Sequence, residues 1–288
     1  EIEVLGYPAI TELARVTGLV DRTRSIEDAK LAAFFAPGAE LDKDWCDYFA
    51  GFDVVVSYLY DPDGFFGANL ERAGVKTLLQ GPFRPGANES TDPAVRQLAQ
   101  PLERFALYLE DPELTLDYGA HVASPLSERD ETAPTTSRRI AIHPGSGSAS
   151  KNWSFESWIE VLSAVRDCCE AVEFVVTSGE AEHETIAEFL SLAEERGLET
   201  IHLEGKTLPE LGAVYGEIDF YLGHDSGISH LAASAGAKGL LLFGPTDPQI
   251  WAPVSSRMKT IVSPDQTLGG IRVESVLEAL EHGELFTA

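Results

Sequence analysis

The pattern of apolar and polar positions is most regular in the second half of the chain. Short aliphatic and β-branched runs alternate there with segments whose apolar residues recur at helical spacing. The runs predict strands at 139–143, 172–177, 200–203, 218–223, 239–243 and 259–262. The segments between them predict helices at 154–169, 183–196, 208–216, 228–236 and 272–282. Six such units in a row are typical of a doubly wound α/β domain with a parallel sheet.

The first half has the same alternation, with weaker periodicity. Its runs predict strands at 2–5, 53–58 and 76–79. Its helical patterns lie at 9–17, 27–36, 66–73 and 93–109. The polar segment Ala123–Arg139, rich in Ser, Thr and Pro, is the best candidate for a linker between two domains. Two Rossmann-like halves of this kind would bind a ligand at the carboxyl ends of their strands.

The charge of the chain excludes some partners. The 288 residues include 47 acids and 21 bases, a net charge of −26. Phosphate backbones would be repelled, so we expect no nucleic-acid partner, and tight docking on anionic lipid is disfavoured. A solubility surface is the plainer explanation of the acidic balance. No apolar run approaches the roughly 20 residues needed to span a bilayer, and no signal-peptide pattern is present.

The cysteines give no sign of a disulfide framework or a zinc site. There are three, Cys46, Cys168 and Cys169, and none has the spacing of zinc ligands. A reducing cytoplasm fits this usage best.

The segment Tyr221–His230 carries the most informative chemistry. An apolar run ends in Asp225-Ser226-Gly227, and a helical pattern begins at once. Asp225 or Ser226 can cap that helix, whose first-turn N–H groups favour an anion, and Gly227 allows close approach to the backbone. His230 follows Ser226 by one turn on the same face. The alternative is an ordinary capped helix with a structural histidine.

A second loop follows the strand 139–143 and runs from His143 to Trp153. Its small residues, Ser146 and Gly147 among them, allow backbone N–H groups to approach phosphate oxygens, and Lys151 adds a positive charge. The Walker A pattern fails here because Asn152 follows the lysine, and the dinucleotide fingerprint fails at Ser150. An ordinary turn with an exposed lysine is the alternative. His143, at the strand end, is placed to face a cleft.

Two further segments are candidates for ligand contacts. Leu240–Pro248 is a buried run that ends in a Gly-Pro turn, where Thr246 and Asp247 either bind a ligand or cap a short helix. Asp61-Pro62-Asp63 follows the strand at 53–58; a D-x-D pair can bind a metal beside a sugar nucleotide, but an Asp-Pro turn is the better interpretation.

Three of these loops together, HPGSGSASKNW, GHDSGISHLAAS and LFGPTDPQIW, resemble glycosyltransferase family 9, the family of lipopolysaccharide heptosyltransferases. Their order and spacing match over 139–254. The resemblance implies a GT-B fold, with two Rossmann-like doubly wound domains facing a cleft. It implies an acceptor-side domain at 1–133 and a donor domain at 134–288, whose last helix is able to pack back on the first.

The resemblance also implies an activity, which is the inverting, metal-independent transfer of a heptose-type sugar to a lipopolysaccharide-core or similar glycan or glycolipid. No cofactor or metal is expected, and ADP-heptose is the favoured donor. The implied donor site comprises Ser146, Gly147, Lys151, Lys206, Thr207, Asp225, Ser226, Gly227 and His230. We expect a cytoplasmic protein with at most peripheral contact at the inner face of the cell membrane.

Two departures from the family pattern matter. The resemblance implies that Glu1 lies in the family's second strand, so we expect no counterpart here to the Gly-Asp loop that holds the family's general base. Asp61 and Asp63 are only fallback bases. The segment Gly179–Glu184 places His183 where the family often has an acid, which leaves its donor contact open. The alternatives are therefore an inactive nucleotide-sugar-binding remnant of the same fold, an NAD-dependent dehydrogenase or a sugar-nucleotide epimerase.

Overall fold

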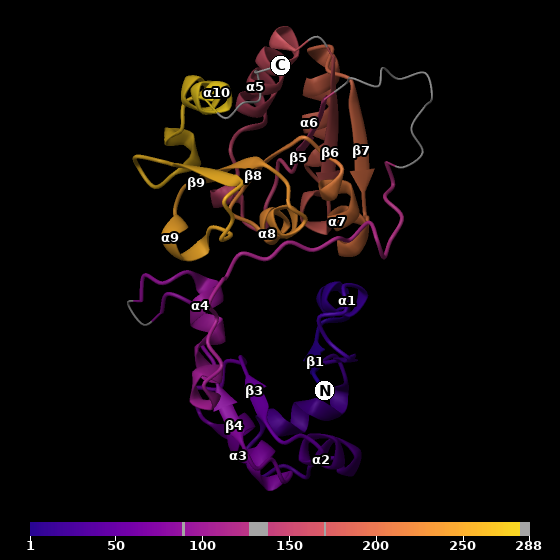
Figure 1. Cartoon of the computed structure of the whole chain (residues 1–288), viewed down its shortest axis with the longest axis vertical. Coiled ribbons are helices and arrows are strands. Elements are labelled where there is room, and N and C mark those ends of the chain that lie inside the picture. The colour runs from indigo at the N-terminus through magenta and orange to yellow at the C-terminus, as the bar shows by residue number, and fades with distance from the viewer. Residues whose placement is uncertain (88–89, 127–137, 170, 283–288) are drawn as a thin grey trace. The chain divides into compact units, whose positions relative to one another are not determined.

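The chain forms two compact units, Glu1–Pro112 and Glu113–Ala288, in a computed structural model that describes residues 1–87, 90–126, 138–169 and 171–282 (Figure 1). The boundary expected at residues 133 and 134 lies outside the described residues, as does most of the expected linker. The segment before that gap belongs to the second unit. Leu116 N donates to Ser234 O at 2.6 Å, and the Tyr118 hydroxyl lies 2.9 Å from Ser234 Oγ.

The second unit is built on a six-stranded parallel sheet. Its strands are β5(Arg138–Ile142), β6(Val172–Ser178), β7(Thr200–Glu204), β8(Phe220–His224), β9(Gly239–Phe243) and β10(Met258–Val262). Their order in the sheet is β10-β9-β8-β5-β6-β7, and every pair is parallel. All six strands predicted from the pattern are therefore confirmed. The order is that of a Rossmann sheet: strands are added toward one edge from β5 to β7 and toward the other edge from β8 to β10, so the switch point lies between β5 and β8.

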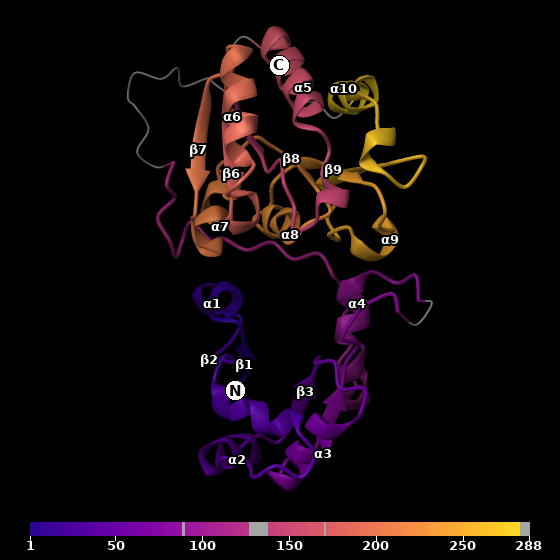
Figure 2. The same ribbon diagram turned by 180° about the vertical axis from the view of Figure 1, so that it is seen from behind.

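Helices cover both faces of this sheet. They are α5(Phe155–Cys168), α6(Ile186–Glu195), α7(Leu208–Gly216), α8(Gly227–Ser234), the short α9(Pro248–Trp251) and α10(Val273–His282). The 3-10 turns η3(Ala149–Lys151), η4(Glu180–Glu182) and η5(Leu268–Gly270) lie in the loops. Figures 1 and 2 show α5, α6 and α10 on one face and α7 and α8 on the other. Ser154 is the N-cap of α5, since its Oγ accepts the Ser157 N–H at 3.1 Å.

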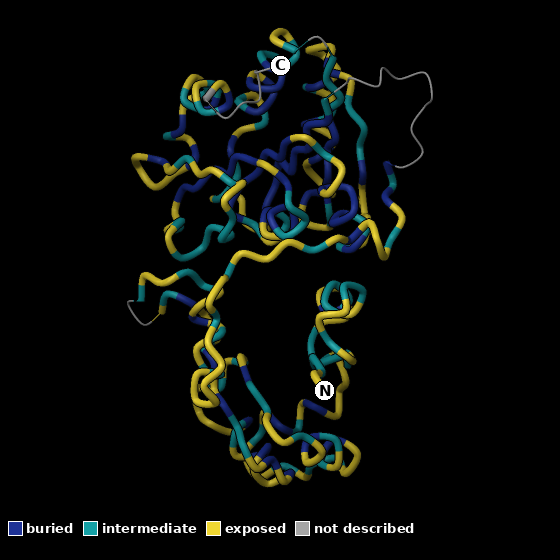
Figure 3. The backbone as a smooth tube through the Cα atoms, in the orientation of Figure 1, coloured by how far each residue is buried: buried dark blue, intermediate teal, exposed yellow. Residues whose placement is uncertain are grey.

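The core of the second unit explains its continuous apolar runs. Every residue of β8 and of β9 is buried, because helices cover both faces of these strands (Figure 3). Ile140 and Ile142 of β5 pack with Trp158 and Leu162 of α5 in one large cluster. The last helix, α10, contributes the fully buried Val276 to that cluster.

The first unit has two short parallel sheets. One pairs β1(Glu3–Gly6) with β2(Arg22–Ser25), and the other pairs β3(Val55–Ser57) with β4(Leu78–Gln80). The helical elements are α1(Pro8–Val16), η1(Ala29–Phe35), α2(Lys43–Ala50), α3(Phe65–Arg72), α4(Ala94–Ala99) and η2(Gln100–Phe105). An aromatic core that includes Phe34, Trp45, Phe49 and Phe66 joins several of them.

Four elements of the first unit differ from what the pattern predicts. The pattern did not reveal β2, because Arg-Thr-Arg-Ser has no apolar position, or α2, because it has only 8 residues, of which Trp45 and Phe49 are buried. The helix expected at 27–36 is the 3-10 segment η1. The helix expected at 93–109 stops being α-helical at residue 99, where Pro101 lacks the N–H that a continuing helix requires.

Candidate functional site

The candidate site lies where β5 and β8 run side by side. Ile142 of β5 pairs with Leu222 of β8, and the His143 N–H continues the ladder to Leu222 O at 3.0 Å. The chain leaves β5 toward α5 on one face and leaves β8 toward α8 on the other. The loops after the two strands therefore diverge at the carboxyl edge of the sheet, which is the place where open α/β sheets bind ligands.

The start of α8 has the geometry expected of an anion site. Ser226, and not Asp225, is the N-cap, with its Oγ accepting the Ser229 N–H at 3.3 Å. Gly227 is exposed at the first helical position, and a Cβ built there would meet no atom within 4 Å. The first-turn N–H groups of a helix lack partners inside the helix and carry its positive dipole end.

Lys151 stands beside this helix start because Asp225 holds it. Its Nζ lies 2.6 Å from Asp225 Oδ2, and the same oxygen accepts the Thr246 hydroxyl at 2.7 Å. Asp225 is 8% exposed, whereas the lysine side chain is 31% exposed and remains open to solvent. The carboxylate thus joins three loops, those after β5, β8 and β9, and fixes a cation at the carboxyl edge of the sheet.

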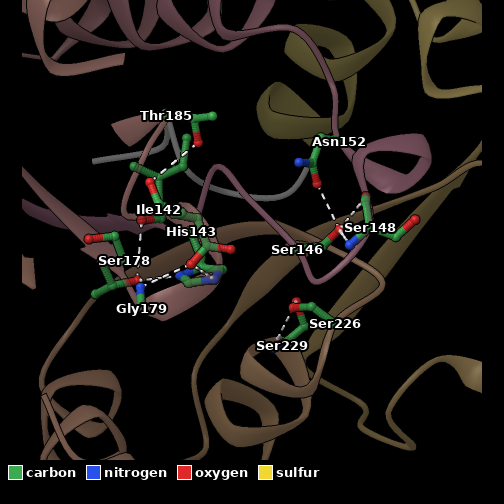
Figure 4. A network of polar contacts seen from close by, with 12 residues as sticks. Ile142, His143, Ser146, Ser148, Asn152, Ser178, Gly179, Thr185, Ser226 and Ser229 are labelled. Carbon is green, nitrogen blue, oxygen red and sulfur yellow. Dashed lines mark hydrogen bonds and ion pairs between the residues drawn. The ribbon is translucent and has the colours of Figure 1, made fainter. Parts of the chain in front are cut away.

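The loop after β5 is held by its own polar side chains. Ser146 Oγ lies 2.7 Å from Asn152 Oδ1 and 2.9 Å from Ser148 O. Figure 4 shows these residues near Ser226 and Ser229 of the α8 start, with His143 on the opposite side of the loop. Gly147 is exposed, and a Cβ there would meet nothing within 4 Å. The middle of the loop is therefore open to a ligand, whereas the Ser146 hydroxyl already has partners within the loop.

The other predicted donor residues lie around this centre. His230 Nε2 donates to Trp251 O at 3.0 Å, which ties α8 to α9. Thr207 is the N-cap of α7, and both its N–H and its hydroxyl are bonded to Glu210, at 2.8 and 2.7 Å. Lys206 is exposed beside it. Lys206 and Thr207 follow β7, the edge strand, whereas Lys151 follows β5, which lies two strands away in the sheet.

The fallback bases lie in the first unit and differ from each other. The Asp61 carboxylate accepts the N–H groups of Phe66 at 3.0 Å and of Gly67 at 2.8 Å, and so caps α3. Asp63 is exposed in the turn that follows. This arrangement favours the Asp-Pro turn that was the better interpretation of the segment. Among the residues that the structure describes, no group of three or more His, Cys, Asp or Glu side chains is arranged to hold a metal ion.

A buried polar layer beneath these loops contains His143, which was expected to face a cleft, and Glu182, which the sequence did not indicate. His143 Nδ1 lies 3.1 Å from Thr177 Oγ1, and its Nε2 lies 3.7 Å from Glu182 Oε2. Burial lowers the pKa of His143 below its ordinary value, although Glu182 opposes the shift. No local pattern marks Glu182, which is one acid among many in this chain and becomes 4% exposed only through tertiary packing.

His224, at the end of β8, is a second buried histidine. Its Nε2 accepts the Trp153 N–H at 2.9 Å and the Trp158 indole N–H at 3.3 Å. Burial, the largest cause, lowers the pKa of His224 to about 3. The ring is therefore neutral at neutral pH, and its proton is on Nδ1, because Nε2 acts as an acceptor.

The fold and the site define an α/β protein with a Rossmann-type sheet, whose carboxyl edge presents a helix start and a lysine. The chain belongs to glycosyltransferase family 9 (heptosyltransferase), whose family profile matches residues 87–279. Lipopolysaccharide heptosyltransferase 3 of Escherichia coli is 32% identical over 123 residues, which are 41% of this chain and 35% of that protein. The match thus spans about a third of the relative's length.

Solved structures show the same fold. A family 9 glycosyltransferase from Veillonella parvula has a TM-score of 0.69 at 15% identity and covers 98% of this chain and 97% of its own. ADP-heptose lipopolysaccharide heptosyltransferase II of E. coli has a TM-score of 0.65 at 17% identity, covering 99% and 89%. The expected α/β GT-B fold class is confirmed. Within the described residues, no helix is both long and apolar enough to cross a membrane.

Proposed function

We propose that this protein transfers a sugar from a nucleoside-diphosphate donor to a glycan or glycolipid acceptor, with the donor diphosphate at the start of α8. One observation carries the proposal: Asp225 holds Lys151 beside a capped helix N-terminus with an exposed glycine, at the switch point of the sheet. Family membership and the name of the E. coli relatives support heptose as the sugar and a lipopolysaccharide core as the acceptor.

The chemistry of the leaving group fits these residues. When the glycosidic bond to the phosphate breaks, the departing nucleoside diphosphate gains negative charge that must be stabilised. The N–H groups at the start of α8 and the Lys151 ammonium supply that stabilisation without a metal ion. When the donor is bound, the Lys151 ammonium donates to a phosphate oxygen. Asp225 then still accepts the hydrogen bond from the Thr246 hydroxyl, so the carboxylate is not left without a partner.

An inverting transfer also requires a base for the acceptor hydroxyl. Asp63 is the better of the two candidates, because the Asp61 carboxylate already accepts two backbone N–H groups. The remaining assignments are Ser146 and Gly147 beside the diphosphate, Lys206 and Thr207 near the nucleobase, and His230 one turn behind the helix start. A protein with these substrates works at the cytoplasmic face of the membrane and visits it peripherally.

The solved structures suggest which nucleotide to try first. Heptosyltransferase WaaC of E. coli, crystallised with ADP, has a TM-score of 0.63 to this chain at 15% identity and covers 98% of it and 100% of its own. ADP-heptose is therefore the first donor in our panel, with GDP- and UDP-sugars for comparison.

Thermal shift with this panel, with and without EDTA, tests the proposal. We expect one nucleotide sugar to raise the Tm and EDTA to leave the shift in place. A shift that EDTA abolishes contradicts metal independence, and no shift with any donor contradicts the proposed function. Binding without transfer in a coupled assay identifies the inactive remnant, whereas a response to NADH alone identifies the dehydrogenase.

A further inference from the structure

The turn at Gly145 is shaped by a side chain from another loop. Gly145 is buried in the loop that follows β5, ahead of the exposed Gly147. A Cβ built on Gly145 would collide with Glu182, lying 2.6 Å from its Oε1 and 2.8 Å from its Cδ. The three nearest atoms all belong to Glu182, so this one side chain occupies the space beside the turn.

Glu182 is itself fixed from two directions. Its Oε2 accepts the Gly179 N–H at 2.9 Å, which closes the turn η4 after β6. The same oxygen lies 3.7 Å from His143 Nε2, and the opposite nitrogen of that ring lies 3.1 Å from Thr177 Oγ1. The Thr177 hydroxyl in turn lies 2.8 Å from the Tyr215 hydroxyl. The side chains of Glu182, His143, Thr177 and Tyr215 are all buried, so the layer is held by packing as well as by polar contacts.

We propose that Glu182 is a positioning residue for donor binding: its side chain sets the course of the backbone at Gly145 and thereby the places of Ser146 and Lys151. The inference rests on the proposed function, because it assumes that this loop contacts the donor diphosphate. Glu182 need not touch the ligand. It acts from below the loop, and a small displacement of reacting or binding groups is enough to weaken recognition strongly.

Binding of ADP, measured by calorimetry well below the Tm of each variant, tests the proposal. We expect Glu182→Ala to weaken ADP binding on the order of tenfold, and Glu182→Gln, which keeps the size of the side chain, to restore most of the affinity. Glu180→Gln, an exposed change on the same turn, is the matched control and should bind ADP as the wild type does. If Glu182 only stabilises the fold, Glu182→Ala will lower the Tm and leave the affinity of the folded protein for ADP unchanged.

A double variant makes the test specific to the contact. Gly145→Ala alone should weaken binding, because its Cβ collides with Glu182. In Gly145→Ala/Glu182→Ala the collision is removed, so we expect the double variant to bind no more weakly than Glu182→Ala. Additive losses, or unchanged affinity in Glu182→Ala, overturn the positioning role alone. Absence of wild-type binding to ADP, GDP and UDP overturns the proposed function and this inference with it.

Discussion

Lys151 Nζ and Asp225 Oδ2 lie 2.6 Å apart, although the two residues come from loops on opposite sides of the sheet's switch point. The pair fixes the lysine next to the start of α8. The free energy of desolvating the lysine is small, because its side chain remains 31% exposed, whereas that of Asp225 is 9% exposed.

Lys151→Ala should weaken nucleoside-diphosphate binding by roughly tenfold to a hundredfold, the value of a charge-assisted hydrogen bond. Calorimetric titration with the best nucleotide measures it. Lys43→Ala is the matched control, because Lys43 forms an exposed pair with Asp47 in the first unit. Equal affinities for Lys151→Ala and wild type would remove this lysine from the site.

Two substitutions of Ser226 distinguish its role as a helix cap from anion binding at the start of α8. Ser226→Ala should cost about 1 kcal/mol of stability, because the cap to the Ser229 N–H is lost. Ser226→Asp should keep the cap and the Tm, and yet bind nucleotide more weakly, because it places a negative charge where the phosphate sits. Chemical denaturation and titration measure the two effects. If Ser226→Asp binds as tightly as wild type, the phosphate is not at this helix start.

Substitution of the two fallback bases should have different effects, one on stability and the other on the transfer rate. Asp61→Ala should lower stability by about 1 kcal/mol, since α3 loses the acceptor for the Phe66 and Gly67 N–H groups. Asp63→Ala should leave the Tm unchanged and lower the transfer rate if Asp63 is the base. Melting curves and initial rates with the identified donor measure both. Full activity of Asp63→Ala would show that Asp63 is not the base.

Stability should fall as the pH drops below about 6.5, the ordinary pKa of an unfolded-state histidine. Burial lowers the folded-state pKa of His224 to about 3, so between these values the unfolded chain binds a proton that the folded chain does not. The loss is up to about 1.4 kcal/mol for each pH unit from this residue, and His143 adds to it in the same direction.

Urea midpoints at pH 7.5 and 5.5 measure this effect. His224→Gln should be less stable at pH 7.5 and lose less on acidification, whereas the exposed His183→Gln should follow the wild type. An identical pH dependence in His224→Gln and wild type would show that His224 is not responsible.

The helices and strands of the second unit could be predicted from the sequence far better than those of the first. Buried strands such as Leu240–Phe243 are continuous apolar runs, and Ser154 and Ser226 mark helix starts, because local chemistry decides both. The strand β2 could not be predicted, since Arg22–Ser25 has no apolar position and exists through its pairing with β1.

The same distinction holds for the candidate site. The residues Lys151 and Asp225 could be chosen from their motifs, but their pairing could not, because it depends on which strands become neighbours. Glu182 was missed because burial against Gly145 is a tertiary property that no short pattern encodes.

The pairing of β5 with β8 has a consequence for how the protein folds. Ile140 pairs with Phe220, so β6, β7 and their helices intervene in the chain before the two central strands can meet. Such distant pairings form slowly, because a long loop must close before the contact is gained. We therefore expect the pairing of β5 with β8 to form late in folding. A ligand bound at that edge should then slow unfolding more than it speeds folding.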